Sequence, residues 1–507
     1  MTLDEFNALA KQGFNRIPLV SETLADLETP LSVYIKLTQA LGSKNTFLLE
    51  SVVGGERFGR YSIIGLPAKT LLRSRGTPAS PINEVVTDDQ VVETDHQNPL
   101  NFIEQFQARF KAAILPGLPR FCGGLAGYFG YDTVRYIEPK LAHSTPKDDL
   151  HLPDIQLLLT EELAVIDNLA GKLYLIVYAN TDQPNAFNTA QARLQLLLNS
   201  LDQPIKVEKS LATVKTSPVR LFAKEEFLEK VRRTKEYILA GDCMQVVFGQ
   251  RISQPFTESP LTLYRALRSL NPSPYLYFYD FGDHQLVGSS PEILVRQEKI
   301  VSADGSSVSR NVTVRPLAGT RPRGKTPEHD AALAKELLAD PKEIAEHVML
   351  IDLARNDIGR IAKIGSVKVT EKMTIEKYSH VQHIVSSVEG ELRSDVTNMD
   401  VLRATFPAGT LSGAPKIRAM EIIDEMEITK RGPYGGAAGY LSFSGEMDVA
   451  IIIRTGLVKD GWVHSQAGAG IVADSNPESE YLETEAKARA VLRAAELVQG
   501  GLHAPHD

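Results

Sequence analysis

The stretch EIAEHVMLIDLARNDIGRIA, residues 343–362, reads as a helix, and it pairs with a second helical stretch, ESEYLETEAKARA, residues 478–490. Each carries two glutamates three residues apart, Glu343 and Glu346 in the first and Glu480 and Glu483 in the second. That spacing puts both carboxylates of a pair on one helix face. Two such faces, opposed, would form an all-oxygen site suited to Mg²⁺, which takes few carboxylates and keeps waters that a substrate can displace. For a lone pair, solvated surface acids are the simpler interpretation, so the case for a metal site depends on the surrounding sequence.

Composition narrows the class of protein. A chain of 507 residues is long enough for two or three domains, and its shares of apolar residues (43%) and charged residues (23%) are those of a globular protein. The net charge of −8, without a basic run, argues against nucleic-acid binding. Two cysteines cannot build a thiolate metal site, and the N-terminus has acids where a signal peptide needs bases. We therefore expect a cytoplasmic protein.

Local patterns predict an α+β fold in which helices cover antiparallel sheets. Strand and loop signals alternate in an N-terminal regulatory and scaffold region, 1–205, and the polar segment 202–218 has no clear period. A second region, 219–500, contains the site candidates. Its helical stretch over roughly 328–363 should break at Pro341, with Asp340 capping the second piece. Residues 435–475, with turn signals between short strands, predict an antiparallel meander.

One short motif suggests a different class of protein, a P-loop NTPase. Residues 319–326, GTRPRGKT, match the phosphate-binding pattern letter for letter, and MLID ends at a candidate acid, Asp352. A P-loop, however, follows a continuous apolar strand of a parallel sheet. The preceding segment alternates and includes Arg315 and Pro316, and no βαβ succession surrounds it. The NTPase stays a remote alternative that ATP binding would revive.

Three features of the second region suggest an anion site. The small residues of QAGAGIV, 466–472, let backbone N–H groups converge on a carboxylate, although a tight bend in a strand explains them equally well. Arg454 ends the apolar run DVAIIIRTG, where it is either half of a buried ion pair or a fork for a substrate carboxylate. Tyr434 lies among glycines that allow a ligand to approach the backbone, although a turn tyrosine is the simpler interpretation.

Two further features suggest acid–base chemistry. Glu292 follows a turn in GSSPE, 288–292, and a carboxyl group in a closed site can have a raised pKa and donate a proton to a leaving group. His380 and His383 lie in the strand-like stretch 378–390, where positions three apart face opposite ways. They cannot form a histidine metal site together, but one of them can act as an acid or base near neutral pH.

Together these motifs resemble the chorismate-utilising enzymes, and among them anthranilate synthase component I. The resemblance covers the whole chain and is strongest over 224–495, in RPLAGTRPRG, AEHVMLIDLARND, TFPAGTLSGAPK, RGPYGGAAGY, IIIRTG, QAGAGIV and ESEYLETEAKA. It implies an antiparallel β-sandwich with helices packed outside. It also implies a lyase of tryptophan biosynthesis: ammonia adds to C2 of chorismate as the C4 hydroxyl leaves, and elimination of pyruvate then gives anthranilate.

The resemblance assigns roles to the residues. Glu346 and Glu483 correspond to the Mg²⁺ ligands, with Glu343 and Glu480 as second acids nearby. His383 corresponds to the histidine of the pyruvate-eliminating step, and Glu292 to the acid that assists loss of the C4 hydroxyl. The substrate contacts correspond to Gly319, Thr320, Thr410, Tyr434, Arg454, Gly468, Ala469 and Gly470.

Two departures separate this chain from its siblings. Aminodeoxychorismate synthases commonly carry a nucleophilic lysine in PIKGT, whereas this chain has PLAGT with Ala318. Isochorismate and salicylate synthases activate water with a lysine in the stretch corresponding to 244–251, and here no lysine occurs from 236 to 298. Both departures favour ammonia as the nucleophile, with the sibling activities as alternatives.

The resemblance also implies regulation and a partner. LLES at 48–51 and NPSPY at 271–275 resemble a tryptophan feedback pocket, lined by Ser51, Pro274, Tyr275 and Leu276. A buried strand end packed on a proline turn is the structural alternative. Neither cysteine suits a glutaminase, so a glutamine amidotransferase subunit, anthranilate synthase component II, is the expected ammonia source. A non-catalytic, tryptophan-sensing protein is the competing hypothesis.

Overall fold

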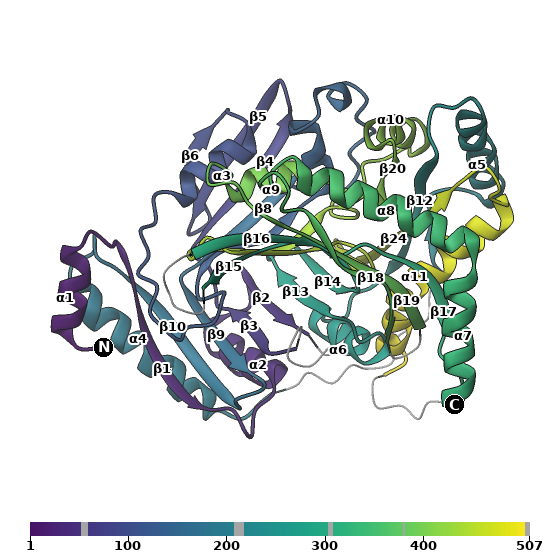
Figure 1. Ribbon diagram of the computed structural model, residues 1–507. Coiled ribbons are helices and arrows are strands. Elements are labelled where there is room, and N and C mark those ends of the chain that lie inside the picture. Colours follow the sequence, from purple (N-terminus) through teal and green to yellow (C-terminus); the bar gives the residue numbers. More distant parts are fainter. Residues whose placement is uncertain (52–58, 207–216, 303–307, 379–380, 502–507) are drawn as a thin grey trace.

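Two large sheets, each drawn from distant parts of the chain, form the framework in Figure 1. The computed structural model describes residues 1–51, 59–206, 217–302, 308–378 and 381–501. The first sheet has 12 strands. The order along its main path is β1 (Arg16–Leu24), β10 (Lys172–Asn180), β9 (Glu162–Asp167), β3 (Tyr61–Gly65), β2 (Thr46–Glu50), β13 (Tyr275–Asp280), β14 (His284–Ser290), β23 (Thr455–Lys459), β24 (Trp462–Ile471), β12 (Gln245–Pro255) and β11 (Val219–Arg220). The remaining strand, β20 (Gly413–Ala414), pairs with β12 off this path.

The second sheet also has 12 strands, and β18 (Lys368–Lys377) pairs with β19 off its main path. The order is β17 (Leu317–Pro322), β19 (Val381–Glu391), β16 (Val308–Val314), β15 (Ile293–Val301), β22 (Met447–Ile451), β21 (Ala437–Ser442), β7 (Gly124–Phe129), β8 (Ile155–Thr160), β4 (Thr70–Thr77), β5 (Ser80–Thr87) and β6 (Gln90–Asp95).

Both sheets join the N-terminal region to the C-terminal region through antiparallel strand pairs. In the first sheet β2 pairs with β13, and in the second β7 pairs with β21. The predicted boundary near 205–219 therefore separates segments of sequence whose strands lie in the same two sheets. The polar segment 202–218 lies mostly outside the described residues.

Helices cover the outer faces of the two sheets, as the fold prediction expects (Figure 1). Apolar clusters pack α2, α4, α6 and α11 on the first sheet and α3, α8 and α9 on the second. A third cluster, which includes Phe47 and Tyr279 of the first sheet and Tyr128 and Leu158 of the second, fills the space between the sheets. The helices are α1 (Leu3–Lys11), α2 (Pro30–Leu41), α3 (Pro99–Gln107), α4 (Ala186–Leu201), α5 (Lys224–Leu239), α6 (Pro260–Leu270), α7 (Pro327–Ala339), α8 (Pro341–Gly359), α9 (Asn398–Thr405), α10 (Lys416–Met426) and α11 (Pro477–Gln499).

The predicted break at Pro341 is confirmed. α7 ends at Ala339, and α8 begins at Pro341, whose missing N–H costs nothing in the first turn of a helix. The Asp340 carboxylate accepts the backbone N–H groups of Lys342 and Glu343, so it caps α8. No helix in the described residues is long and apolar enough to cross a membrane.

The meander predicted over 435–475 is wrong in one respect. β21 and β22 belong to the second sheet, whereas β23 and β24 belong to the first, so the chain crosses between sheets after Ile451. Arg454 lies at the end of this crossing, with a left-handed backbone φ of 52°. A β-branched or bulky apolar residue is disfavoured in that conformation.

The P-loop alternative does not agree with the fold. β17, which contains the first residues of the motif, pairs antiparallel with β19 instead of lying in a parallel sheet. The backbone N–H of Gly324 donates to the Asp330 carboxylate at 2.9 Å, so an acid occupies the position that a phosphate would need.

Candidate active site

The first glutamate pair projects from α8 toward the ends of β12 and β17. Gln245 Nε2 donates to Glu346 Oε1 at 3.1 Å, and Arg321 Nη1 lies 3.4 Å from Glu343 Oε1. Burial and the neighbouring Glu346 raise the pKa of Glu343. A nearby cation would relieve both effects, because it favours the charged carboxylate.

The second pair lies on α11, which packs on β24. Glu483 forms an ion pair with Lys487 at 2.7 Å, one helical turn along. Burial raises the pKa of Glu480, which is 7% exposed; a hydrogen bond with Ser475 opposes this effect and the Glu483 charge adds to it. The first turns of the two helices lie near each other, since the positive charge of Lys342 on α8 also acts on Glu480.

The donors offered by the two helices fit a hard, oxygen-preferring cation. They are carboxylates with one amide side chain close by, and Mg²⁺ keeps several waters in such sites. In the part of the chain that the structure describes, no three His, Cys, Asp or Glu side chains are gathered closely enough to hold a metal by themselves. Water and substrate oxygens would therefore have to complete the coordination.

His383 lies on β19 beside a bulge in β17. Its Nδ1 lies 2.9 Å from the carbonyl oxygen of Gly319 and 3.1 Å from Thr320 Oγ1. A carbonyl accepts only, so this contact assigns the proton to Nδ1 and leaves the Nε2 lone pair available to accept one. Burial lowers the pKa of His383, which is therefore neutral at pH 7. His380 lies outside the described residues.

The bulge also connects His383 to the first glutamate pair. Gly319 has a left-handed φ of 65°, and the register of β17 against β19 shifts between Ala318 and Thr320. A Cβ at Gly319 would lie 3.1 Å from Glu343 Oε2, so a larger residue would have to displace the carboxylate slightly and would also be strained at this φ.

Glu292 is a buried acid just after β14. It is 7% exposed, and Thr410 Oγ1 donates to its Oε1 at 3.2 Å. Burial raises the pKa of Glu292 to about 8, against the opposing effect of the Thr410 hydrogen bond. A carboxyl group with this pKa is mostly protonated at pH 7 and is able to donate a proton.

Arg454 offers an unused cation at the centre of this arrangement. Within the described ranges its side chain has no hydrogen bond or ion pair, and burial lowers its pKa, while Tyr434, Glu483 and Glu292 act on it through space in the opposite direction. A partly buried guanidinium without a partner suits a carboxylate supplied by a ligand, because an Arg–carboxylate fork satisfies both groups. The other interpretation, half of a buried ion pair, finds no partner for Arg454 among the described residues.

The QAGAGIV segment forms an extended strand, β24, instead of a bend. Gly468, Ala469 and Gly470 pair with Gly249, Phe248 and Val247 of β12, whereas β23 pairs only as far as Ser465. Beyond Ser465 the opposite edge of β24 is therefore free of β23. Along it, Lys487 Nζ donates to the Gly468 carbonyl at 2.9 Å and the Gly468 N–H bonds to Tyr434.

Sequence reasoning missed two polar residues of the site. Gln245 contacts Glu346 and packs so closely on Gly470 that a Cβ there would lie 2.4 Å from its Nε2. Lys487 joins Glu483 to the Gly468 carbonyl and also acts electrostatically on Glu292. The four-residue spacing of Glu483 and Lys487 was a usable signal, since such pairs meet on a helix face. Gln245 had none.

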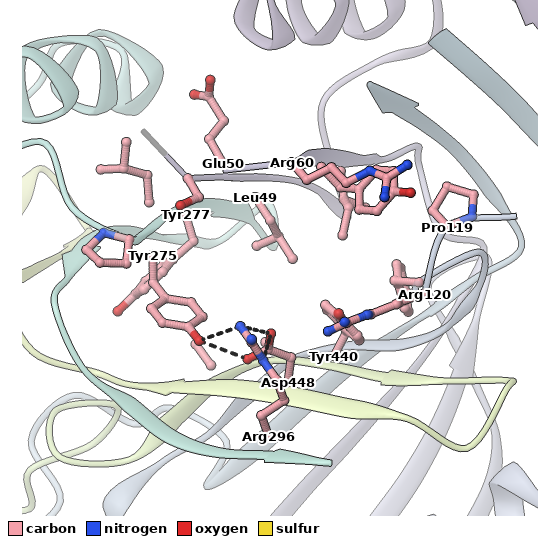
Figure 2. Close-up of a pocket in the computed structure, with 18 of the residues that line it drawn as sticks. Leu49, Glu50, Arg60, Pro119, Arg120, Tyr275, Tyr277, Arg296, Tyr440 and Asp448 are labelled. Atoms are coloured by element: carbon pink, nitrogen blue, oxygen red, sulfur yellow. Dashed lines mark hydrogen bonds and ion pairs between the residues drawn. The ribbon is translucent and has the colours of Figure 1, made fainter. Parts of the chain in front are cut away.

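The four residues predicted to hold an inhibitor line a separate cavity of about 300 Å³ (Figure 2). Tyr275, Arg296 and Asp448 lie on one side of it: Tyr275 Oη donates to Asp448 at 3.2 Å, and Arg296 pairs with Asp448 at 2.9 Å. Arg60 and Arg120 lie on the other side. The cavity lining includes Leu49, Glu50, Ser51, Arg60, Tyr61, Arg120, Pro274, Tyr275, Leu276, Tyr277, Arg296, Tyr440 and Asp448.

A short path leads from this cavity to Glu292. Tyr275 of β13 pairs with Ser290 of β14, and the Glu292 backbone N–H donates to Ser290 Oγ at 3.3 Å.

Comparison with known proteins relates this geometry to a family. Residues 67–493 match the family described as chorismate binding enzyme. The chain is 57% identical over 501 residues to anthranilate synthase component 1 of Neisseria meningitidis serogroup A, covering 98% of this chain and 99% of that one. It is 55% identical over 513 residues to the protein of the same name from Pseudomonas aeruginosa, with 98% and 99% covered.

Solved structures show the same fold. Anthranilate synthase component I from Streptococcus pneumoniae superposes with a TM-score of 0.74 at 38% identity, covering 87% of this chain and 94% of that one. The menaquinone-specific isochorismate synthase MenF from Escherichia coli gives a TM-score of 0.69 at 19% identity, with 97% and 98% covered. The second likeness concerns the fold alone.

Proposed function

Since the chain belongs to the family of chorismate-binding enzymes, we propose that it is the large subunit, component I, of an anthranilate synthase. It converts chorismate to anthranilate and pyruvate with ammonia as the nitrogen donor. One observation carries the residue assignments. A neutral acid, Glu292, and a neutral base, His383, both lie near Arg454, a cation that has no side-chain partner among the described residues.

In the first step Glu292 acts as a general acid. Its carboxyl group is protonated at neutral pH and gives that proton to the leaving C4 hydroxyl as ammonia forms the bond to C2. Arg454, with Tyr434, holds the enolpyruvyl carboxylate, so that the ring is oriented before the bond breaks. Gly319, Thr320, Thr410 and the β24 residues Gly468, Ala469 and Gly470 are further substrate contacts.

In the second step His383 acts as the base. Its Nε2 removes the proton from C2, the C3–O bond to the enolpyruvyl group breaks, and the ring becomes aromatic as pyruvate leaves. The proton on Nδ1 stays bonded to the Gly319 carbonyl, which holds the ring in the required tautomer.

Mg²⁺, when bound, supplies a template and Lewis acid for the ring carboxylate. Glu346 and Glu483 would hold it, with Glu343 and Glu480 in direct or water-mediated contact. The raised pKa values of Glu343 and Glu480 support this assignment, because a divalent cation stabilises carboxylates that burial leaves under-solvated.

Ala318 favours anthranilate over aminodeoxychorismate. It lies on β17 immediately before Gly319, at the position where the sibling enzymes carry their nucleophilic lysine, and a methyl group cannot attack the ring. The corresponding absence of a lysine in 244–251 leaves the site without the base that activates water in isochorismate and salicylate synthases.

Two further elements complete the proposal. A glutamine amidotransferase subunit supplies ammonia in the cytoplasm, and tryptophan binds in the cavity of Ser51, Pro274, Tyr275 and Leu276 and inhibits by coupling to the chorismate site. The strand pair between Tyr275 and Ser290 supports that coupling.

The decisive experiment uses the purified chain with chorismate, Mg²⁺ and ammonium, without a partner. Anthranilate is followed by fluorescence and the product identified by mass. Anthranilate is the expected product; aminodeoxychorismate, isochorismate or salicylate would identify a sibling activity, and the absence of any product would favour a tryptophan sensor.

A further inference from the structure

A buried ion pair between Arg431 and Glu427 lies beneath the substrate-contact residues, and neither side chain takes part in the steps above. The two side chains are 1% and 3% exposed. Arg431 Nε donates to Glu427 Oε2 at 2.8 Å and its Nη2 to Oε1 at 2.7 Å, so the contact is bidentate. The pair raises the pKa of Arg431, despite the opposing effect of its burial, and keeps its charge fixed.

The remaining hydrogen bonds of the pair go to backbone of two site segments. Arg431 Nη1 donates to the carbonyl of Leu411 at 2.7 Å, and Leu411 follows Thr410, the partner of Glu292. Arg431 Nη2 donates to the carbonyl of Val247 at 2.8 Å.

The Glu427 carboxylate contacts the same strand, β12, two residues further along. The Gly249 N–H donates to Glu427 Oε1 at 3.1 Å. Val247 and Gly249 are the β12 partners of Gly470 and Gly468 on β24. The ion pair therefore contacts the strand that pairs with the predicted backbone anion site.

The guanidinium also lies against two tyrosine rings. Its centre is 4.5 Å from the ring centroid of Tyr131 and 5.5 Å from that of Tyr434. Both are cation–π distances, and the Tyr434 hydroxyl points to the Gly468 N–H. One planar cation therefore touches two of the segments from which substrate contacts project, at Leu411 and Tyr434, and also touches β12, the strand that pairs with Gly468–Gly470.

Such a pair is poorly suited to stabilising the fold as such. Desolvating two charges costs about as much as their attraction returns, and apolar replacements of similar volume are often neutral or better. What the pair does supply is direction: five N–H donors in a rigid fork meet acceptors at fixed angles, which apolar packing cannot reproduce.

We propose that Arg431, held by Glu427, is a positioning residue that sets the spacing of Tyr434, Thr410 and the Gly468–Gly470 strand for the carboxylate of the substrate. The proposal rests on the proposed chorismate site. Arg431 acts through residues that contact substrate, so replacing it should raise KM for chorismate, which the loss of a purely stabilising ion pair would not do.

The test compares Arg431→Lys, the double variant Glu427→Met with Arg431→Met, and a matched control. The control is Asp132→Asn, which weakens another buried ion pair, that of Arg135 with Asp132 and Asp424. For each protein, the melting temperature and the kcat and KM for chorismate consumption are measured with saturating ammonium and Mg²⁺, and the product is identified separately.

We expect KM to rise about tenfold or more in both Arg431 variants, the effect of losing one well-formed hydrogen bond to the subsite, with a smaller change in kcat. The double variant leaves the Leu411 and Val247 carbonyls and the Gly249 N–H without their side-chain partners, so its melting temperature should fall; the control, which also loses a buried ion pair, should keep the parent's KM. If Arg431→Lys folds like the parent, it decides the question even where the double variant does not fold.

A folded Arg431 variant with the parent's KM would overturn the proposal, as would an equal rise of KM in the control. A product other than anthranilate from the parent would refute the proposed function instead. Because KM is measured by chorismate consumption, the two failures are distinguishable.

Discussion

The Nδ1 atom of His383 lies 2.9 Å from the carbonyl oxygen of Gly319, and this contact fixes which ring nitrogen can accept a proton. Because the carbonyl cannot donate, Nε2 is the basic atom, and burial keeps the ring neutral. A neutral imidazole in a fixed tautomer suits the role of base that is proposed for His383.

Replacing His383 should therefore separate the two chemical steps. In His383→Ala the second step should slow about 10²- to 10⁴-fold, the usual contribution of a general base, while the first continues. The aminated intermediate should then accumulate and be seen by mass spectrometry after quenching. Full turnover to anthranilate in this variant would remove His383 from the mechanism.

The pH dependence should report Glu292. Burial raises its pKa to about 8, and the acid must be protonated to act, so kcat/KM should fall as the pH rises through about 8. The Thr410 hydrogen bond favours the charged form, so Thr410→Val should move this alkaline limb to higher pH. A limb that stays in place, or moves down, would contradict the assignment.

The same group affects stability. The folded chain binds the Glu292 proton more tightly than the unfolded chain does, so the free energy of unfolding should fall as the pH rises toward 8. Glu292→Gln removes the titrating group and should flatten this part of the stability profile, which urea unfolding at several pH values would measure.

Mg²⁺ dependence should follow the two glutamate pairs. Glu346→Gln and Glu483→Gln should each lower activity at fixed Mg²⁺ by about tenfold to a hundredfold, the loss usual for a disturbed metal site, and a chelator should abolish activity in the parent. Because the pKa values of Glu343 and Glu480 are raised, mainly by burial, Mg²⁺ affinity should fall as the pH is lowered and protons compete with the cation for these carboxylates. Calorimetric titration at two pH values tests this independently of turnover.

Tryptophan inhibition should depend on the cavity in Figure 2. Ser51→Arg places a long cation in a cavity of about 300 Å³ and should abolish inhibition. Activity with ammonium should stay within about twofold, because Ser51 is not among the residues assigned to the chemistry. Persisting inhibition would show that tryptophan binds elsewhere.

A conservative change at the same site gives a matched control. Ser51→Thr adds one methyl group and should weaken inhibition far less than Ser51→Arg does. Loss of inhibition in both variants to the same degree would point to disturbance of the strand end instead of occupation of the cavity.

How much could be predicted from the sequence depended on how local each feature is. The break between α7 and α8 follows from Pro341 and Asp340, two adjacent residues, and was predicted correctly. The glutamate pairs, Glu292 and His383 carry local or motif signals of the same kind. The absence of a side-chain partner for Arg454 in the described part of the chain could not be foreseen, because it depends on where the chain crosses between sheets.

The pairing of distant strands was equally invisible. Nothing in 46–50 specifies pairing with 275–280. Alternating apolar residues indicate that a strand has one buried face, but they do not identify the neighbouring strand. The contact of Gln245 with Glu346 depends on that long-range arrangement and was missed for the same reason.

The joining of β2 to β13 and of β7 to β21 has a consequence for how the protein is made. When the first 200 or so residues leave the ribosome, β2 and β7 are still unpaired on one edge, because their partners β13 and β21 are synthesised much later. Until then this half is exposed to wrong edge-to-edge association. Either half expressed alone should therefore aggregate, and co-expression of the two halves as separate chains should restore a soluble protein.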